Sequence, residues 1–176
     1  MKIIIYGSQY GTAKQYAEEL SKTTNIKLES YENVKSIDNY ETIIYIGALY
    51  AGGVLGMAKT LKKISNYENK KIIIATVGLA DPMDIENTNN IKNGIKRQLS
   101  NEIYEKAYIY HLRGGIDYSK LNFAHRTMMS LLYKKACGLP EEKKTAEVKA
   151  MIDTYKQKVN FVDFSSLKNI IKVIQN

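Results

Sequence analysis

The chain has 176 residues, enough for one well-buried domain and too few for two of ordinary size. No stretch approaches the roughly 20 apolar residues that a membrane-spanning helix needs. Cys137 is the only cysteine, which excludes an intramolecular disulfide and a thiolate metal cage. Because the apolar N-terminal run is also too short for a signal peptide, we expect a cytoplasmic protein.

The net charge of +8 is concentrated in the last third of the chain. Residues 1–112 carry a net charge of +2, whereas residues 113–176 carry +6. A basic excess of this kind indicates an acidic partner, although a general bias toward Lys in the sequence is an alternative explanation. No nucleic-acid reader motif accompanies the charge, so we expect no nucleic acid among the partners.

Short apolar runs rich in β-branched residues alternate with helical patterns. Strands are expected at 2–6, 42–48, 71–77 and 107–112, with a weaker one at 26–31. Helices are expected at 12–23, 56–65 and 85–101, and a last one after a capping residue at Asp163, Ser165 or Ser166. This order predicts an α/β fold with a doubly wound parallel sheet, which binds ligands at the carboxyl ends of its strands.

The first loop at such an end, residues 7–13, suits a terminal phosphate. Ser8 and Thr12 provide hydroxyl groups, Gly11 lets backbone N–H groups close around an anion, and the following helix directs its positive end at the same place. The loop lacks the endings of a Walker loop and of a dinucleotide turn. An ordinary Ser/Gly turn between a strand and a helix is the alternative.

Residues 6–13, Tyr-Gly-Ser-Gln-Tyr-Gly-Thr-Ala, resemble the FMN phosphate loop of flavodoxins, and especially its form in diflavin reductases. The resemblance implies a flavodoxin-like five-stranded parallel sheet with FMN as the cofactor. It also implies that the phosphate is wrapped by Ser8, Gln9, Tyr10, Gly11, Thr12 and Ala13. Ala13 stands where many simple flavodoxins have Thr, so one hydroxyl contact is absent from the pattern.

Two further loops follow strands where flavodoxins sandwich the flavin ring. The loop after the third strand contains Ala48, Leu49, Tyr50, Ala51 and Gly52, and the loop after the fourth contains Val77, Gly78, Leu79 and Ala80. Tyr50 can lie flat against an isoalloxazine ring. No acid/base pair, nucleophilic dyad or metal cluster emerges from the sequence. We therefore expect no catalytic side chain, and the flavin would carry the chemistry.

Residues 113–160 form an insert that a small flavodoxin does not need, within a single domain spanning 1–176. Helices are expected at about 120–137 and 141–159. The first has an apolar stripe of Leu121, Ala124, Met128, Leu131 and Leu132, and the second has one of Val148, Met151, Ile152, Tyr155 and Val159. Basic residues accompany these stripes.

Residues 112–121 and 125–129, together with the two flavin loops, resemble the menaquinone-dependent protoporphyrinogen oxidase branch of flavodoxin-like proteins. The resemblance implies an FMN-dependent oxidoreductase acting on a tetrapyrrole, in either redox direction, with a quinone or a redox protein as electron partner. Arg113, Arg126, Lys134 and Lys135 are the candidate contacts for the acidic substrate or partner. An anionic membrane surface is a further possible partner.

Two alternative functions remain at this point. The protein can be an electron carrier that docks on a redox partner, or a binding module without turnover. In either case the apolar stripes can simply pack on the sheet while the cations face water.

Overall fold

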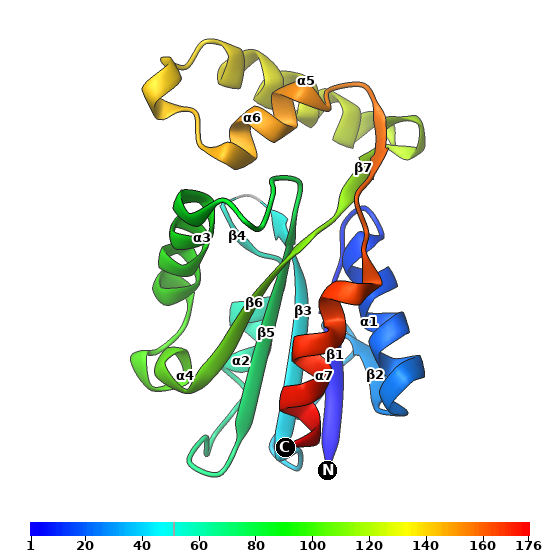
Figure 1. The fold of residues 1–176 in the computed structure, drawn as a ribbon, viewed down its shortest axis with the longest axis vertical. Helices are drawn as coiled ribbons and strands as arrows, with labels where there is room; N and C mark the ends of the chain where they lie inside the picture. Colours follow the sequence, from blue (N-terminus) through cyan, green and yellow to red (C-terminus); the bar gives the residue numbers. More distant parts are fainter. Residues whose placement is uncertain (51) are drawn as a thin grey trace.

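The computed structural model describes residues 1–50 and 52–176, which form a parallel sheet with helices on both faces (Figure 1). The strands are β1 Lys2–Gly7, β2 Lys27–Ser30, β3 Thr42–Tyr50, β4 Gly53–Val54, β5 Lys71–Gly78, β6 Ala107–Arg113, β7 Gly115–Asp117 and β8 Lys158–Asn160. The helices are α1 Thr12–Thr24, α2 Met57–Leu61, α3 Ile85–Gln98, α4 Asn101–Lys106, α5 Phe123–Cys137, α6 Ala146–Asp153 and α7 Lys168–Gln175. Short 3-10 turns lie at Tyr118–Lys120, Glu141–Lys143 and Phe164–Leu167.

The main sheet has the strand order β2-β1-β3-β5-β6, and β4 pairs with β3. Every neighbouring pair along this path is parallel, and only the short β4 is antiparallel to its partner. The chain therefore builds outward from β1 on both sides, and the strand order reverses between β1 and β3. This confirms the predicted flavodoxin-like, five-stranded, doubly wound parallel sheet.

The apolar strands bury both of their faces. Ile3 and Ile5 pack in a cluster with residues of α2, α3 and α4, whereas Ile4 packs in a second cluster with residues of α1 and α7. All three side chains are fully buried. Burial on both faces explains why β1, β3 and β5 are runs of Ile rather than alternating patterns.

The helix expected at 85–101 is two helices, α3 and α4. Leu99 adopts an extended conformation at the end of α3, and the Ser100 side chain accepts a hydrogen bond from the backbone N–H of Ile103 to begin α4. The helix expected at 56–65 is also shorter, since α2 ends at Leu61.

The insert lies across the carboxyl ends of the central strands, with α5 and α6 at one end of the molecule (Figure 1). It has its own two-stranded antiparallel sheet of β7 and β8, which the sequence did not predict. The second predicted helix ends at Asp153, and the left-handed backbone of Lys156 leads the chain into β8. A small cluster that contains Ile116 and Met129 joins the insert to Tyr10 and Leu79 of the main domain.

The predicted inward stripe of α5 is partly wrong. Leu131 is 63% exposed and Ala124 is exposed as well, whereas Leu132, although 43% exposed, lines a cavity on the inner side of the helix. Met129 and Ala136 are the buried residues of this helix. Within residues 1–50 and 52–176, no helix is both long and apolar enough to cross a membrane.

Candidate functional site

The first loop forms an open cradle at the N-terminus of α1. The Ser8 hydroxyl accepts a hydrogen bond from the backbone N–H of Gly11 at 3.1 Å. Gly11 has a φ of +93°, and among the described residues no heavy atom lies within 4 Å of the position of an added Cβ. No described side chain caps α1, and its first turn contains no acidic residue. Its first-turn N–H groups and positive dipole therefore suit an anion such as a phosphate.

The tip of this loop contacts the insert. Gln9 Nε2 and His125 Nε2 of α5 lie 3.1 Å apart, and the Tyr10 and His125 rings meet edge to face at 5.9 Å. The Tyr10 hydroxyl is buried and has no hydrogen-bond partner in the described part of the chain. Burial, and secondarily the electrostatic influence of the neighbouring Tyr50 hydroxyl, raise the pKa of Tyr10. A buried hydroxyl without a partner is costly, so Tyr10 is suited to bind a polar group of a ligand.

The second loop turns tightly between β3 and β4, where Leu49 pairs with Val54 and Tyr50 pairs with Gly53. Gly52 supplies the left-handed φ of +79° that the turn requires. Ala51, predicted to contact the flavin, lies outside the described residues. The Tyr50 hydroxyl donates to the Met128 sulfur at 3.5 Å, so this loop also contacts α5.

The third loop is held by a carboxylate from the insert. Backbone N–H groups of Leu79 and Ala80 donate to the two Glu147 oxygens at 3.1 and 3.2 Å. Gly78 leaves room for this carboxylate, because an added Cβ would overlap Glu147 Oε1. Burial raises the pKa of Glu147, while these backbone hydrogen bonds, Asn87 and the positive charge of Arg113 act in the opposite direction.

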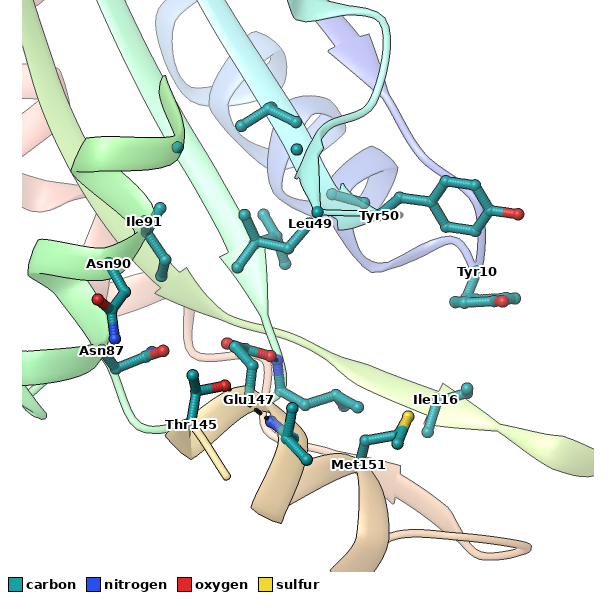
Figure 2. Close-up of a pocket in the computed structure, with 18 of the residues that line it drawn as sticks. Tyr10, Leu49, Tyr50, Asn87, Asn90, Ile91, Ile116, Thr145, Glu147 and Met151 are labelled. Atoms are coloured by element: carbon teal, nitrogen blue, oxygen red, sulfur yellow. Dashed lines mark hydrogen bonds between the residues drawn. The ribbon is translucent and has the colours of Figure 1, made fainter. Parts of the chain in front are cut away.

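The three loops open into one cavity of about 530 Å³ between the ends of the strands and the insert (Figure 2). The predicted residues that line it are Tyr10, Thr12, Ala48, Leu49, Tyr50, Gly52, Val77 and Leu79. The remaining predicted residues that the structure describes, Ser8, Gln9, Gly11, Ala13, Gly78 and Ala80, belong to the same loops and do not line the cavity. Its size is within the range of pockets for small molecules and cofactors.

Other lining residues were not predicted as part of the site. They include Asn87, Asn90, Ile91 and Arg97 of α3, Met129 of α5, Thr145 before α6, and Glu147, Val148 and Met151 of α6. Figure 2 shows Glu147 and Met151 on the insert, opposite Leu49. The sequence signal for Glu147 is an acidic residue four positions before Met151 on the apolar side of its helix.

None of the four predicted cations is among the described residues that line this cavity. Arg113 donates through Nε to the Leu79 carbonyl at 3.0 Å, and its guanidinium lies 3.9 Å from the centre of the Phe161 ring. Arg126 is exposed and donates to the Ser119 carbonyl, and Lys134 and Lys135 are exposed in the last turn of α5. Arg113 thus holds the third loop in place, whereas the other three are open to solvent.

Comparison with known proteins gives one family match. The family model described as flavodoxin domain matches residues 3–143, more than half of the chain. No curated protein matches this chain.

Solved structures of flavoproteins are similar at low identity. A putative flavoprotein from Bacteroides uniformis is 11% identical, with 64% of this chain and 90% of that chain covered and a TM-score of 0.46. A flavoprotein from Lactobacillus acidophilus, solved in complex with FMN, is 12% identical, with 64% and 91% covered and a TM-score of 0.40. A flavodoxin variant from Pseudomonas aeruginosa is 16% identical, with 78% and 97% covered and a TM-score of 0.41.

Proposed function

Because this chain belongs to the flavodoxin-domain family, we propose that it is an FMN-dependent oxidoreductase whose flavin binds in the cavity beneath the insert. The observation that carries the proposal is the convergence of three strand-end loops on one cavity whose lining also includes residues of α5 and α6. A flavin supplies two-electron redox chemistry, and the protein supplies binding, orientation and electrostatics.

Each loop has a separate part in holding the cofactor. The cradle of Ser8, Gly11 and Thr12 would bind the phosphate through hydroxyl and backbone N–H groups at the positive end of α1. Tyr50 would pack against the ring, and the Tyr10 hydroxyl would meet a polar group. The insert would exclude water from the ring, which strengthens electrostatic interactions inside the cavity.

For the substrate we propose a tetrapyrrole, either a porphyrinogen that is dehydrogenated or a porphyrin-derived product that is reduced. Met128, Met129 and Met151 line the cavity and give it an adaptable apolar wall that suits a flat ring. The exposed cations of α5 would attract acidic side groups. In dehydrogenation the substrate would lose two electrons and two protons; a bound flavin would supply the redox chemistry for this, with a quinone or a redox protein as the final electron acceptor.

The second candidate is an electron carrier that docks on a partner protein. It is favoured by the position of Arg126, Lys134 and Lys135, which face solvent rather than the cavity. Cations in that position can guide an acidic protein surface as readily as a small acid.

Turnover measurements separate the two candidates. FMN-loaded protein would be mixed without oxygen with a porphyrinogen, while flavin absorbance and porphyrin fluorescence are recorded. For the enzyme, we expect the flavin to be reduced and turnover to fall in a Met128→Ala/Met151→Ala variant, but not in the control Met83→Ala, whose side chain is 83% exposed.

Neutralising Arg126, Lys134 and Lys135 together tests the role of the cations. We expect slower tetrapyrrole turnover at unchanged FMN affinity, and raised salt should have the same effect because it screens exposed charges. If the wild type ignores tetrapyrroles yet reduces a partner protein quickly, and the triple variant slows only that reaction, the electron-carrier function replaces the enzyme.

A further inference from the structure

Helix α5 has two apolar sides. Met128, Met129 and Leu132 line the cavity, whereas Phe123 and Leu131 face solvent with exposed fractions of 85% and 63%. Phe123 and Leu131 are eight residues apart, about two turns, and therefore share the outer side of the helix. Figure 1 places α5 at the end of the molecule opposite the chain termini.

The charged side chains of α5 itself are all positive. Residues 123–137 contain Arg126, Lys134 and Lys135 and no Asp or Glu, and the three cations are exposed. Arg126 also lines a second hollow, of about 370 Å³, together with Lys156 and the neighbouring Tyr118, Ser119 and Tyr155. This surface combines apolar side chains with cations on a protruding helix.

We propose that the outer face of α5 docks on an anionic lipid bilayer, with Phe123 and Leu131 entering the boundary between headgroups and acyl chains. Arg126, Lys134 and Lys135 would contact lipid phosphates, and the hollow between Arg126 and Lys156 would receive a headgroup. Exposed aromatic and aliphatic side chains beside Lys and Arg are the combination found on helices that lie in a membrane interface. A protruding helix without acidic residues complements a negatively charged plane better than a groove of mixed charge.

Docking of this kind gives the cavity a position relative to the bilayer. The same helix has Met128 and Leu132 in the cavity wall and Phe123 on its outer side, so the cavity lies directly behind the docked surface. Only α5 would then separate the cavity from an apolar substrate or quinone dissolved in the bilayer. The docking itself does not depend on bound FMN.

Vesicle sedimentation tests the proposal with the full chain. Wild type would be mixed at low salt with vesicles of phosphatidylglycerol and phosphatidylcholine, and with vesicles of phosphatidylcholine alone. We expect sedimentation only with the anionic vesicles, reversed by high salt, and about tenfold weaker binding for Phe123→Ser/Leu131→Ser. The control is Tyr108→Ser, since Tyr108 is 48% exposed near the start of β6, at the opposite end of the sheet.

Circular dichroism and thermal unfolding of both variants would establish that they keep the fold. The proposal is overturned if the wild type stays in the supernatant with anionic vesicles, which would leave a protein partner for this face. Equal sedimentation of Phe123→Ser/Leu131→Ser and wild type would also overturn it. Inorganic phosphate in excess should not release the bound protein beyond its effect as a salt, because the proposed ligand is the lipid surface.

Discussion

Glu147 Oε2 accepts a hydrogen bond from the backbone N–H of Leu79 at 3.1 Å. Leu79 follows β5, and Glu147 lies on α6 of the insert. This bond and its neighbour at Ala80 connect the insert to the loop after β5, beside the cavity that Leu79 and Glu147 both line. We therefore expect this carboxylate to help hold α6 against the loop after β5.

The first prediction concerns the pH dependence of this connection. Burial raises the pKa of Glu147 above its ordinary value of 4.5, so between these two pKa values the folded state binds more protons than the unfolded state. The stability that the protonated Glu147 carboxyl group contributes is fully present below pH 4.5. It is lost as the pH rises through the raised pKa of the folded state. In urea unfolding, the stability of wild type relative to Glu147→Gln should therefore fall as the pH rises. A difference that is flat with pH would contradict this, and the exposed Glu142→Gln is the control.

Tyr10→Phe should change stability and FMN affinity in opposite directions. Removing a buried hydroxyl without a partner should raise the free energy of unfolding of the FMN-free protein by about 1 kcal/mol, and it should weaken FMN binding if the ligand is the missing partner. Tyr118→Phe is the matched control, because its hydroxyl is also buried without a described partner but Tyr118 does not line the cavity. That variant should gain stability and keep its FMN affinity; equal loss of affinity in both would refute the assignment. Urea unfolding and flavin fluorescence measure the two quantities.

Gly11→Val should weaken FMN binding strongly while the helix content stays intact. The side chain would project into the open cradle, and a φ of +93° costs a residue with a Cβ about 1–2 kcal/mol. Gly138→Ala is the control, since Gly138 has a φ of −80° and its added Cβ would meet only ordinary contacts at 3.6 Å or more. Flavin titration and circular dichroism check both effects. Unchanged affinity in Gly11→Val would move the phosphate site elsewhere.

His111 should stay neutral in the folded protein down to acidic pH. Burial, and secondarily the charge of Lys92, lower its pKa from 6.5 to about 4, and its Nδ1 lies 2.8 Å from the Thr76 hydroxyl. The stability from this neutral ring is fully present above pH 6.5 and is lost as the pH falls through about 4. A nuclear magnetic resonance titration should show the ring shifting near pH 4. A midpoint near 6.5 would contradict the buried environment.

The fold was predictable because the short apolar runs fit strands and do not fit helices. Residues 2–6 and 71–77 are too short and too β-branched for helices, and each is followed by glycine. The helix limits were less predictable where a single local feature decides them. Ser100 divides a continuous periodic pattern by capping a second helix, and Lys156 turns the chain into β8 by adopting a left-handed conformation.

The candidate site was predictable only where the sequence is contiguous. The three loops were located because each follows a strand, but the roof of the cavity comes from residues far along the chain. Glu147 and Leu79 are 68 positions apart, and only tertiary packing brings them together. Likewise, periodicity alone cannot tell which side of α5 meets the main domain, so Leu131 was expected inside although it faces solvent.

A comparison of three flavins tests the proposed FMN site most directly. Purified, flavin-free protein would be titrated with FMN, riboflavin and FAD while flavin fluorescence is recorded. FMN should bind most tightly, because riboflavin lacks the phosphate for the cradle at Gly11, and no adenosine-binding unit is expected for FAD. Equal affinity for riboflavin and FMN, tighter binding of FAD, or no binding of any flavin would contradict the proposal.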